Sequence, residues 1–244
     1  MNQILFYLVI LLTNIIQGIT GFAGTILAMP VSIDLVGYNT AQPILNFLGL
    51  LAGVYVALGH RKSIRYKEVG KIIVFMAAGI FAGFGLKHLV AGHEKVLYVV
   101  FGCFILFIAV KGLLKTLGIS ERKENNLPSG ESVAVLAGAG VIHGIFVSGG
   151  PLVVSYLSGR LHDKEAFRST ISTVWIVLNG IILVSDITAG LYTAPVVREQ
   201  FISIPFLLGG MVIGGALFRR MKQRTFMLLT YVLLIASGIL MLFK

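Results

Sequence analysis

The chain has 244 residues, of which 57% are hydrophobic and 12% are charged, and its mean hydropathy is +0.92. Soluble domains carry about 25% charged residues, so this composition excludes a soluble globular protein and a disordered one. A helix needs roughly 20 apolar residues to cross a bilayer. The long windows without Asp, Glu, Lys or Arg are 1–33, 35–60, 72–86, 96–110, 132–159, 169–185, 200–218 and 225–243. The sequence therefore predicts an all-α polytopic membrane protein.

The formal net charge of +10 is explained by membrane topology, because Lys and Arg concentrate on the cytoplasmic side of membrane proteins. If residues 132–159 form a hairpin that returns to its own side, one face collects 16 of the 20 Lys and Arg residues. The segments on that face are 59–71, 111–131, 158–168 and 219–224. A single crossing by 132–159 would split the charges 11 against 9, so the hairpin is favoured. No nucleic-acid partner is expected.

The sequence indicates an internal duplication. A shift of 126 positions lays Gln17-Gly18-Ile19 on His143-Gly144-Ile145, and a similar offset pairs Gly79-x3-Gly83 with Gly210-x3-Gly214. We expect a first transmembrane repeat at 1–115, a cytoplasmic linker at 116–131 and a second transmembrane repeat at 132–244. Each repeat would have three full crossings besides its hairpin, an odd number, which predicts two inverted repeats of the kind common in secondary transporters.

The first segment of each half is interrupted by glycines. Residues 1–33 and 132–159 are too long for one membrane helix and too short for two, and Pro30 or Pro151 follows the glycines. Glycine permits non-helical backbone and proline removes a donor, so a helical break is predicted at both places. Each is expected to be a re-entrant hairpin, although the first hairpin is inferred from the repeat alone.

Two such breaks predict a small anion site near the membrane midplane, because helix N-termini present free N–H groups and a positive dipole end. Alternating access would then come from one half rocking against the other.

His143 is the intramembrane group that titrates near neutral pH, which makes proton coupling a hypothesis. The alternative is a neutral histidine that is hydrogen-bonded inside the bundle. Asn46 and Asn179 could instead merely tie helices together, and the two glycine pairs could serve close packing. The candidate site residues are Gln17, Gly18, Thr20, Gly21, Gly24, Thr25, Asn46, His143, Gly144, Ser148, Gly149, Gly150, Ser172, Thr173 and Asn179.

Three other residues are expected to be structural or solvated. Asp34 and Asp186 fall at window ends, which favours solvated caps, and Cys103 lies inside an apolar window, which favours an inert core thiol. A single cysteine gives no disulfide framework and no multi-cysteine metal site. We therefore expect no metal and no cofactor.

The two glycine-rich motifs resemble those of a known family. Residues 17–30, QGITGFAGTILAMP, look like the first motif of the TauE/SafE sulfite exporter family, also called the toluene sulfonate uptake permeases, and residues 143–154, HGIFVSGGPLVV, resemble its second copy. The resemblance covers the whole chain. The first copy has Ala23 where a glycine is common, and the second has Val147-Ser148 before its glycine pair and Tyr156 where the family often has proline. These departures leave the substrate open.

The resemblance implies a secondary carrier in the cell (inner) membrane for small sulfur-containing anions such as sulfite, thiosulfate, a sulfonate or a sulfoacetate-like compound. A passive anion channel or an accessory subunit of a membrane complex is the alternative, since neither composition nor spacing separates them from a carrier. A membrane-embedded enzyme is disfavoured, because no two carboxylates share a window and no histidine-rich metal motif is present. The direction of transport and the oligomeric state stay open, with a homodimer among the alternatives.

Overall fold

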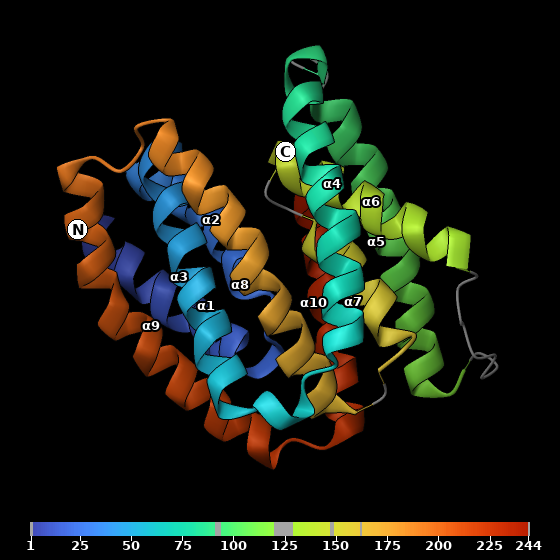
Figure 1. Ribbon diagram of the computed structural model, residues 1–244. Helices are drawn as coiled ribbons and strands as arrows, with labels where there is room; N and C mark the ends of the chain where they lie inside the picture. The colour runs from blue at the N-terminus through green and yellow to red at the C-terminus, as the bar shows by residue number, and fades with distance from the viewer. Residues whose placement is uncertain (1, 91–93, 120–128, 147–148, 162, 244) are drawn as a thin grey trace. The chain divides into compact units, whose positions relative to one another are not determined.

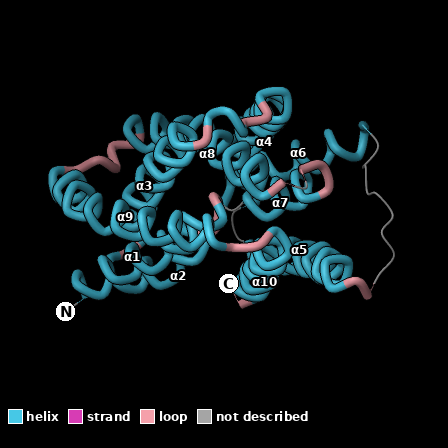
Figure 2. The backbone as a smooth tube through the Cα atoms, turned by 90° about the horizontal axis from the view of Figure 1, so that it is seen from below, coloured by secondary structure: helices cyan, strands magenta, loops and turns pink. Residues whose placement is uncertain are grey.

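The computed structural model describes residues 2–90, 94–119, 129–146, 149–161 and 163–243 (Figure 1). Every regular element in these ranges is a helix, as the cyan tube of Figure 2 shows. The all-α prediction is therefore confirmed. The helices are α1 (Asn2–Thr20), α2 (Gly24–Val36), α3 (Tyr38–Gly59), the 3-10 turn η1 (Arg61–Ser63), α4 (Tyr66–Val90), α5 (Glu94–Leu117), α6 (Ser129–Phe146), α7 (Gly150–Ser158), α8 (Lys164–Thr188), α9 (Ala194–Arg220) and α10 (Gln223–Leu242).

The chain folds into two compact units, each of which takes helices from both halves of the sequence. Unit 1 comprises Met1–Val69 and Arg168–Met221, and so holds α1, α2, α3, most of α8 and α9. Unit 2 comprises Gly70–Phe167 and Lys222–Lys244, and so holds most of α4, then α5, α6, α7 and α10. Within unit 1, α1 packs against α9, and within unit 2, α5 packs against α10.

Both predicted helical breaks are present at the glycines. The first separates α1 from α2 at residues 21–23, and the second separates α6 from α7, which begins at Gly150. In each case the second helix packs back against the first, α2 on α1 and α7 on α6. Pro30 lies inside α2, whereas Pro151 lies in the first turn of α7, where a missing N–H costs nothing. α1 has 19 residues and is itself long and apolar enough to cross a membrane, which the sequence interpretation of 1–33 as a short hairpin did not anticipate.

One packing arrangement occurs in both units. In unit 1, a Cβ atom on Gly210 of α9 would lie 2.6 Å from the carbonyl oxygen of Leu11, and one on Gly214 would collide with Ile15 O beside Gly18. In unit 2, the equivalent Cβ on Gly79 of α4 would collide with Ala137 O, and one on Gly83 would lie 2.5 Å from Val141 O beside Gly144. The contacted residues Leu11, Ile15 and Gly18 are related to Ala137, Val141 and Gly144 by the same shift of 126 positions. We call these two contacts the glycine seams; they confirm that both glycine pairs serve close helix packing.

The equivalent helices α3 and α8 also meet each other, inside unit 1. Asn46 contacts Asn179, and Gly53 approaches the carbonyl oxygen of Ser172. Residue numbers therefore increase along α3 in the direction in which they decrease along α8. The two helices are therefore antiparallel. A shift of 126 positions takes Asn46 to Ser172 and Gly53 to Asn179. The residue of α3 in each contact is therefore equivalent to the residue of α8 in the other contact. Contacts that exchange in this way are what a local two-fold relation between α3 and α8 produces.

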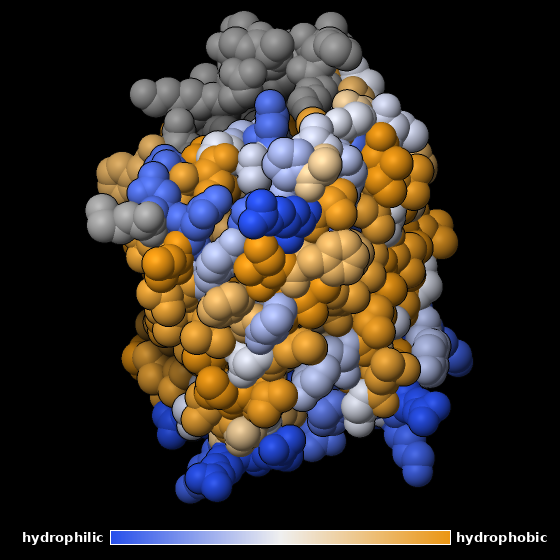
Figure 3. All heavy atoms as spheres, turned by 90° about the vertical axis from the view of Figure 1, so that its left-hand side faces the viewer, coloured by the Kyte–Doolittle hydropathy of each residue, from blue (hydrophilic) through white to orange (hydrophobic). Residues whose placement is uncertain are grey.

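The lengths and surfaces of the helices fit a membrane. Among the described residues, six helices are long and apolar enough to cross one, namely α1, α3, α4, α8, α9 and α10. Large apolar side chains such as Leu12, Phe81, Phe201 and Val212 are exposed to the surroundings. Figure 3 shows one face on which apolar residues fill most of the middle and hydrophilic residues gather toward the edges. Cys103 of α5 is exposed, which corrects the expectation of a core thiol: it occupies a face of α5 that no described helix covers.

Candidate functional site

The backbone of the first break is held by two side chains of α1. Gly21 has a positive φ of 84°, and its N–H donates to Gln17 O at 2.7 Å, which ends α1. The Gln17 side chain then reaches across the break, where its Oε1 accepts the N–H of Gly24, the first residue of α2, at 2.7 Å. Thr20 Oγ1 lies 3.4 Å from the N–H groups of Phe22 and Ala23. The N-terminus of α2 is therefore fixed inside unit 1, and side-chain oxygens already accept hydrogen bonds from some of the N–H groups there.

The α3–α8 contact brings more polar groups to this place. We call it the polar seam; its members are Gln42, Asn46, Gly49 and Gly53 on α3 and Ser172, Asn179 and Asp186 on α8. Asn46 Nδ2 donates to Asn179 O at 3.1 Å, while Asn46 Oδ1 is buried and has no hydrogen-bond partner among the described residues. A Cβ atom on Gly49 would lie 2.8 Å from Asn179 Nδ2 and 3.2 Å from Thr25 Oγ1. Because Thr25 belongs to the first turn of α2, the polar seam and the N-terminus of α2 meet at Gly49.

Ser172 joins the polar seam to the break itself. Its Oγ donates to Gly21 O at 3.4 Å, and a Cβ atom on Gly21 would lie 2.6 Å from that oxygen. The hydroxyl of the next residue, Thr173, bonds along its own helix, since its Oγ1 donates to Ser169 O at 2.8 Å. The structure therefore gathers one set of the predicted site residues in unit 1 around the start of α2. That set is Gln17, Thr20, Gly21, Gly24, Thr25, Asn46, Ser172 and Asn179.

The remaining predicted site residues have other surroundings. Gly18 and Gly144 belong to the glycine seams, where Gly18 packs on Met211 of α9 and Gly144 packs on Ile80 of α4. His143, Gly149 and Gly150 are buried in unit 2, and a Cβ atom on Gly149 would lie 2.8 Å from His143 Cβ. Ser148 lies outside the described residues. The second break thus has its histidine placed against the start of α7 much as Gln17 is placed against the start of α2.

Two buried charged residues at the ends of α8 were not among the candidates. Asp186 is 6% exposed, and Gln42 Nε2 donates to both of its carboxylate oxygens at 3.1 Å, so the expectation of a solvated cap is wrong. Asp34, by contrast, is exposed on α2, as expected. Arg168 is 2% exposed, and its guanidinium carbon lies 4.4 Å from the ring centroid of Phe218. Both residues flank the charge-free window 169–185, which shows where they lie in the sequence but not that they are buried.

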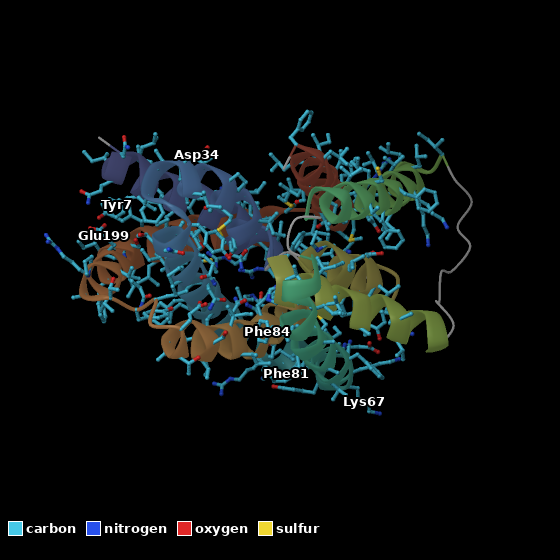
Figure 4. The ribbon with its side chains drawn as sticks, turned by 90° about the horizontal axis from the view of Figure 1, so that it is seen from above. Tyr7, Asp34, Lys67, Phe81, Phe84 and Glu199 are labelled. Carbon is cyan, nitrogen blue, oxygen red and sulfur yellow. The ribbon has the colours of Figure 1, made fainter. Side chains whose placement is uncertain are left out.

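A further polar contact ties the starts of α1 and α9 together. The Tyr7 hydroxyl donates to Glu199 Oε2, and Gln3 Nε2 lies 3.4 Å from Glu199 Oε1. Figure 4 shows Tyr7 and Glu199 beside each other, with Asp34 at some distance from them. Within the described part of the chain, no three His, Cys, Asp or Glu side chains are grouped as metal ligands would be.

Comparison with known proteins identifies the family. Residues 6–241 match the model of the family described as sulfite exporter TauE/SafE. The chain is 25% identical over 179 residues to a protein of Comamonas testosteroni named "Probable inner membrane transporter protein TsaS", and the match covers 73% of this chain and 72% of that protein. No solved structure matches. Since the family match spans nearly the whole chain and the helices suit a membrane, the chain belongs to the TauE/SafE sulfite exporter family and is a multi-pass membrane transporter.

Proposed function

We propose that the chain is a secondary carrier of small sulfur-containing anions in the inner membrane, with part of its binding site at the N-terminus of α2. The observation that carries this proposal is the meeting of three elements at Gly49: the first turn of α2, Asn46 of α3 and Asn179 of α8. Polar side chains inside membrane segments are costly, so a buried group of them marks a pathway for a polar solute. Helix N–H groups and amide N–H groups together suit an oxyanion or a sulfonate.

The substrate class rests on the relatives. The family is described as sulfite exporters, and the relative from Comamonas testosteroni is named a membrane transporter. Sulfite, thiosulfate and sulfonates all present several oxygen acceptors around one sulfur, which matches a site made of N–H and hydroxyl donors. His143, with Gly149 and Gly150, is proposed as a second candidate position for the anion, at the start of α7 within unit 2.

Alternating access by inverted repeats is the proposed mechanism. Two observations support it. The glycine seams show that α1 with α9 and α6 with α4 are packed alike, and the antiparallel polar seam shows that the equivalent helices α3 and α8 run in opposite directions. Opposite directions of equivalent helices are what an inverted duplication requires.

The first experiment is a thermal-shift screen of the purified protein in detergent against sulfite, thiosulfate, sulfate, sulfoacetate, taurine, phosphate, acetate and chloride. A ligand that binds only the folded protein raises the unfolding midpoint with the logarithm of its concentration. Selective stabilisation by a sulfur oxyanion or a sulfonate is expected, followed by uptake of that anion into proteoliposomes. Stabilisation by all anions alike, or by none, would contradict the proposal and favour a channel or an accessory subunit.

A pair of variants on α3 tests the place of the site. Gly49→Ala puts a methyl group 2.8 Å from Asn179 Nδ2, so Asn179 and Thr25 have to move and the anion-dependent shift is expected to fall. Gly59→Ala is the matched control, because the same methyl group there meets no atom within 4 Å. Equal anion-dependent shifts in both variants would place the site elsewhere.

A further inference from the structure

The end of the polar seam away from Ser172 holds a buried carboxylate. Asp186 lies in the last turn of α8, and Gln42 lies in the second turn of α3, with exposed fractions of 6% and 3%. Gln42 Nε2 donates to both Asp186 oxygens at 3.1 Å. Both residues belong to unit 1, so this contact is part of the same antiparallel α3–α8 packing as Asn46 and Asn179.

Two phenols, those of Tyr192 and Tyr38, lie near Asp186. Tyr192, in the connection between α8 and α9, donates its hydroxyl to Pro43 O at 3.1 Å, beside Gln42 in the chain. Burial and the Asp186 carboxylate both raise the pKa of Tyr192, so this phenol stays neutral at physiological pH. Tyr38, the first residue of α3, is also within electrostatic range of the carboxylate. Asp186 therefore has an uncharged hydrogen-bond donor, the Gln42 amide, and a nearby phenol, Tyr192, that stays uncharged.

The chemistry of the Gln42–Asp186 contact suits a proton. An amide donates through nitrogen and accepts through oxygen, so Gln42 can donate to the carboxylate and, after its amide turns by half a rotation, can accept from the carboxylic acid. The contact is thus satisfied in both protonation states. Ionisable groups buried in membrane segments typically mark ion pathways.

The position of the contact links it to the proposed site. Asn46 follows Gln42 by one turn on α3, and Asn179 precedes Asp186 by about two turns on α8, so both contacts join the same two helices. We propose that Asp186 binds the proton that drives transport through this carrier. The proton comes from water on one side, forms an O–H bond with an Asp186 oxygen and returns to water on the other side. This inference rests on the proposed carrier function.

The first test reads the proton on Asp186 directly and needs no substrate. Infrared difference spectra of the purified full-length protein, recorded across a pH titration, detect the C=O stretching band of a protonated carboxylic acid. The wild type is expected to show such a band, and Asp186→Asn is expected to lose it. Asp34→Asn, which changes the exposed carboxylate of α2, is the control and is expected to keep the band. Identical spectra for the wild type and Asp186→Asn would overturn the inference, even if the protein transports anions.

The second test separates coupling from binding, with radiolabelled thiosulfate in proteoliposomes. Asp186→Asn is expected to lose accumulation driven by a pH gradient while it keeps thiosulfate exchange, which moves no net proton. Loss of gradient-driven accumulation in His143→Gln, together with its retention in Asp186→Asn, would overturn the inference in favour of His143. If the wild type does not move thiosulfate at all, thiosulfate is excluded as the substrate, and the infrared titration alone decides whether Asp186 carries a proton.

A milder variant guards against misfolding of Asp186→Asn. Gln42→Leu removes the donor to both carboxylate oxygens and keeps the carboxyl group. The carboxylic acid band and the pH dependence of accumulation are expected to move together to higher pH by about one unit, because hydrogen bonds to a charged group are lost. A pH dependence that does not move in Gln42→Leu would contradict the inference.

Discussion

The two broken segments share a backbone plan and differ in the side chains placed against their second helices. In both, the first helix is fixed by a glycine seam, at Gly210 and Gly214 in unit 1 and at Gly79 and Gly83 in unit 2. In the first break, Gln17 Oε1 accepts the Gly24 N–H and so occupies part of the α2 N-terminus. In the second break, the equivalent side chain is His143, packed against Gly149. The two segments therefore share close backbone packing and differ in the polar groups placed against it.

The largest effect is expected from closing the glycine seams. Gly214→Ala and Gly83→Ala each put a Cβ atom against backbone, at Ile15 O and Val141 O, and each should cost about 3 kcal/mol of stability. The unfolding midpoint and the monodispersity of the detergent-solubilised protein measure this. Gly138→Ala is the control, because that position on α6 meets no atom within 4 Å. Tolerance of one seam variant and not the other would break the equivalence of the two seams.

The break itself should respond more mildly. Gly21→Ala forces an alanine to a φ of 84° and brings its Cβ within 2.6 Å of Ser172 Oγ, for an expected loss of about 2 kcal/mol. Gly37→Ala also forces an alanine to a positive φ, of 80°, but its Cβ meets no atom within 4 Å, so about 1 kcal/mol is expected from backbone strain alone. Thermal unfolding of both variants gives the difference. Equal losses would mean that the contact between Ser172 and the break contributes little.

A substitution at Gln17 sharpens the chemical difference between the breaks. Gln17→Glu keeps an oxygen acceptor for the Gly24 N–H, but the side chain is only 4% exposed, so burial of the carboxylate should cost about 1–2 kcal/mol of stability. The added negative charge should also repel an anion from the start of α2 and abolish the anion-dependent thermal shift. A retained shift would assign anion binding to another part of the chain, such as the second break.

The smallest effect is expected at Thr173. Its hydroxyl bonds to Ser169 O in its own helix, so Thr173→Ala should change stability and anion-dependent shifts by no more than about 0.5 kcal/mol. A clear loss of the anion-dependent shift would restore Thr173 to the site.

The breaks could be predicted from sequence because their causes are local. Glycines at 18, 21 and 24 and at 144, 149 and 150, with a proline close behind, disfavour a continuous helix wherever they occur. The polar seam was predicted in part: Asn46, Ser172 and Asn179 stood out as polar residues in apolar windows, and the structure brings them to one place.

The burial of Asp186 and the exposure of Cys103 could not be predicted in the same way. Asp186 lies at the end of an apolar window, where solvent is the usual surrounding, and its burial depends on Gln42, which is 144 positions away in the sequence. Cys103 lies inside an apolar window, but whether α5 turns that face to another helix or to the surroundings depends on tertiary packing. Both outcomes are decided by contacts between distant segments, which no local pattern encodes.

The interleaving of the two units has a consequence for how the protein is made. α1, α2 and α3 emerge first, yet their partners α8 and α9 follow only after α4 to α7 have been synthesised. Unit 2 in turn is complete only when α10 is added. Until then the side-chain N–H groups of Asn46 and Gln42 lack the acceptors that they bond in the finished protein, within a bilayer where unsatisfied polar groups are costly. The early helices thus depend on late ones, and a chain arrested after α7 would leave both units unfinished.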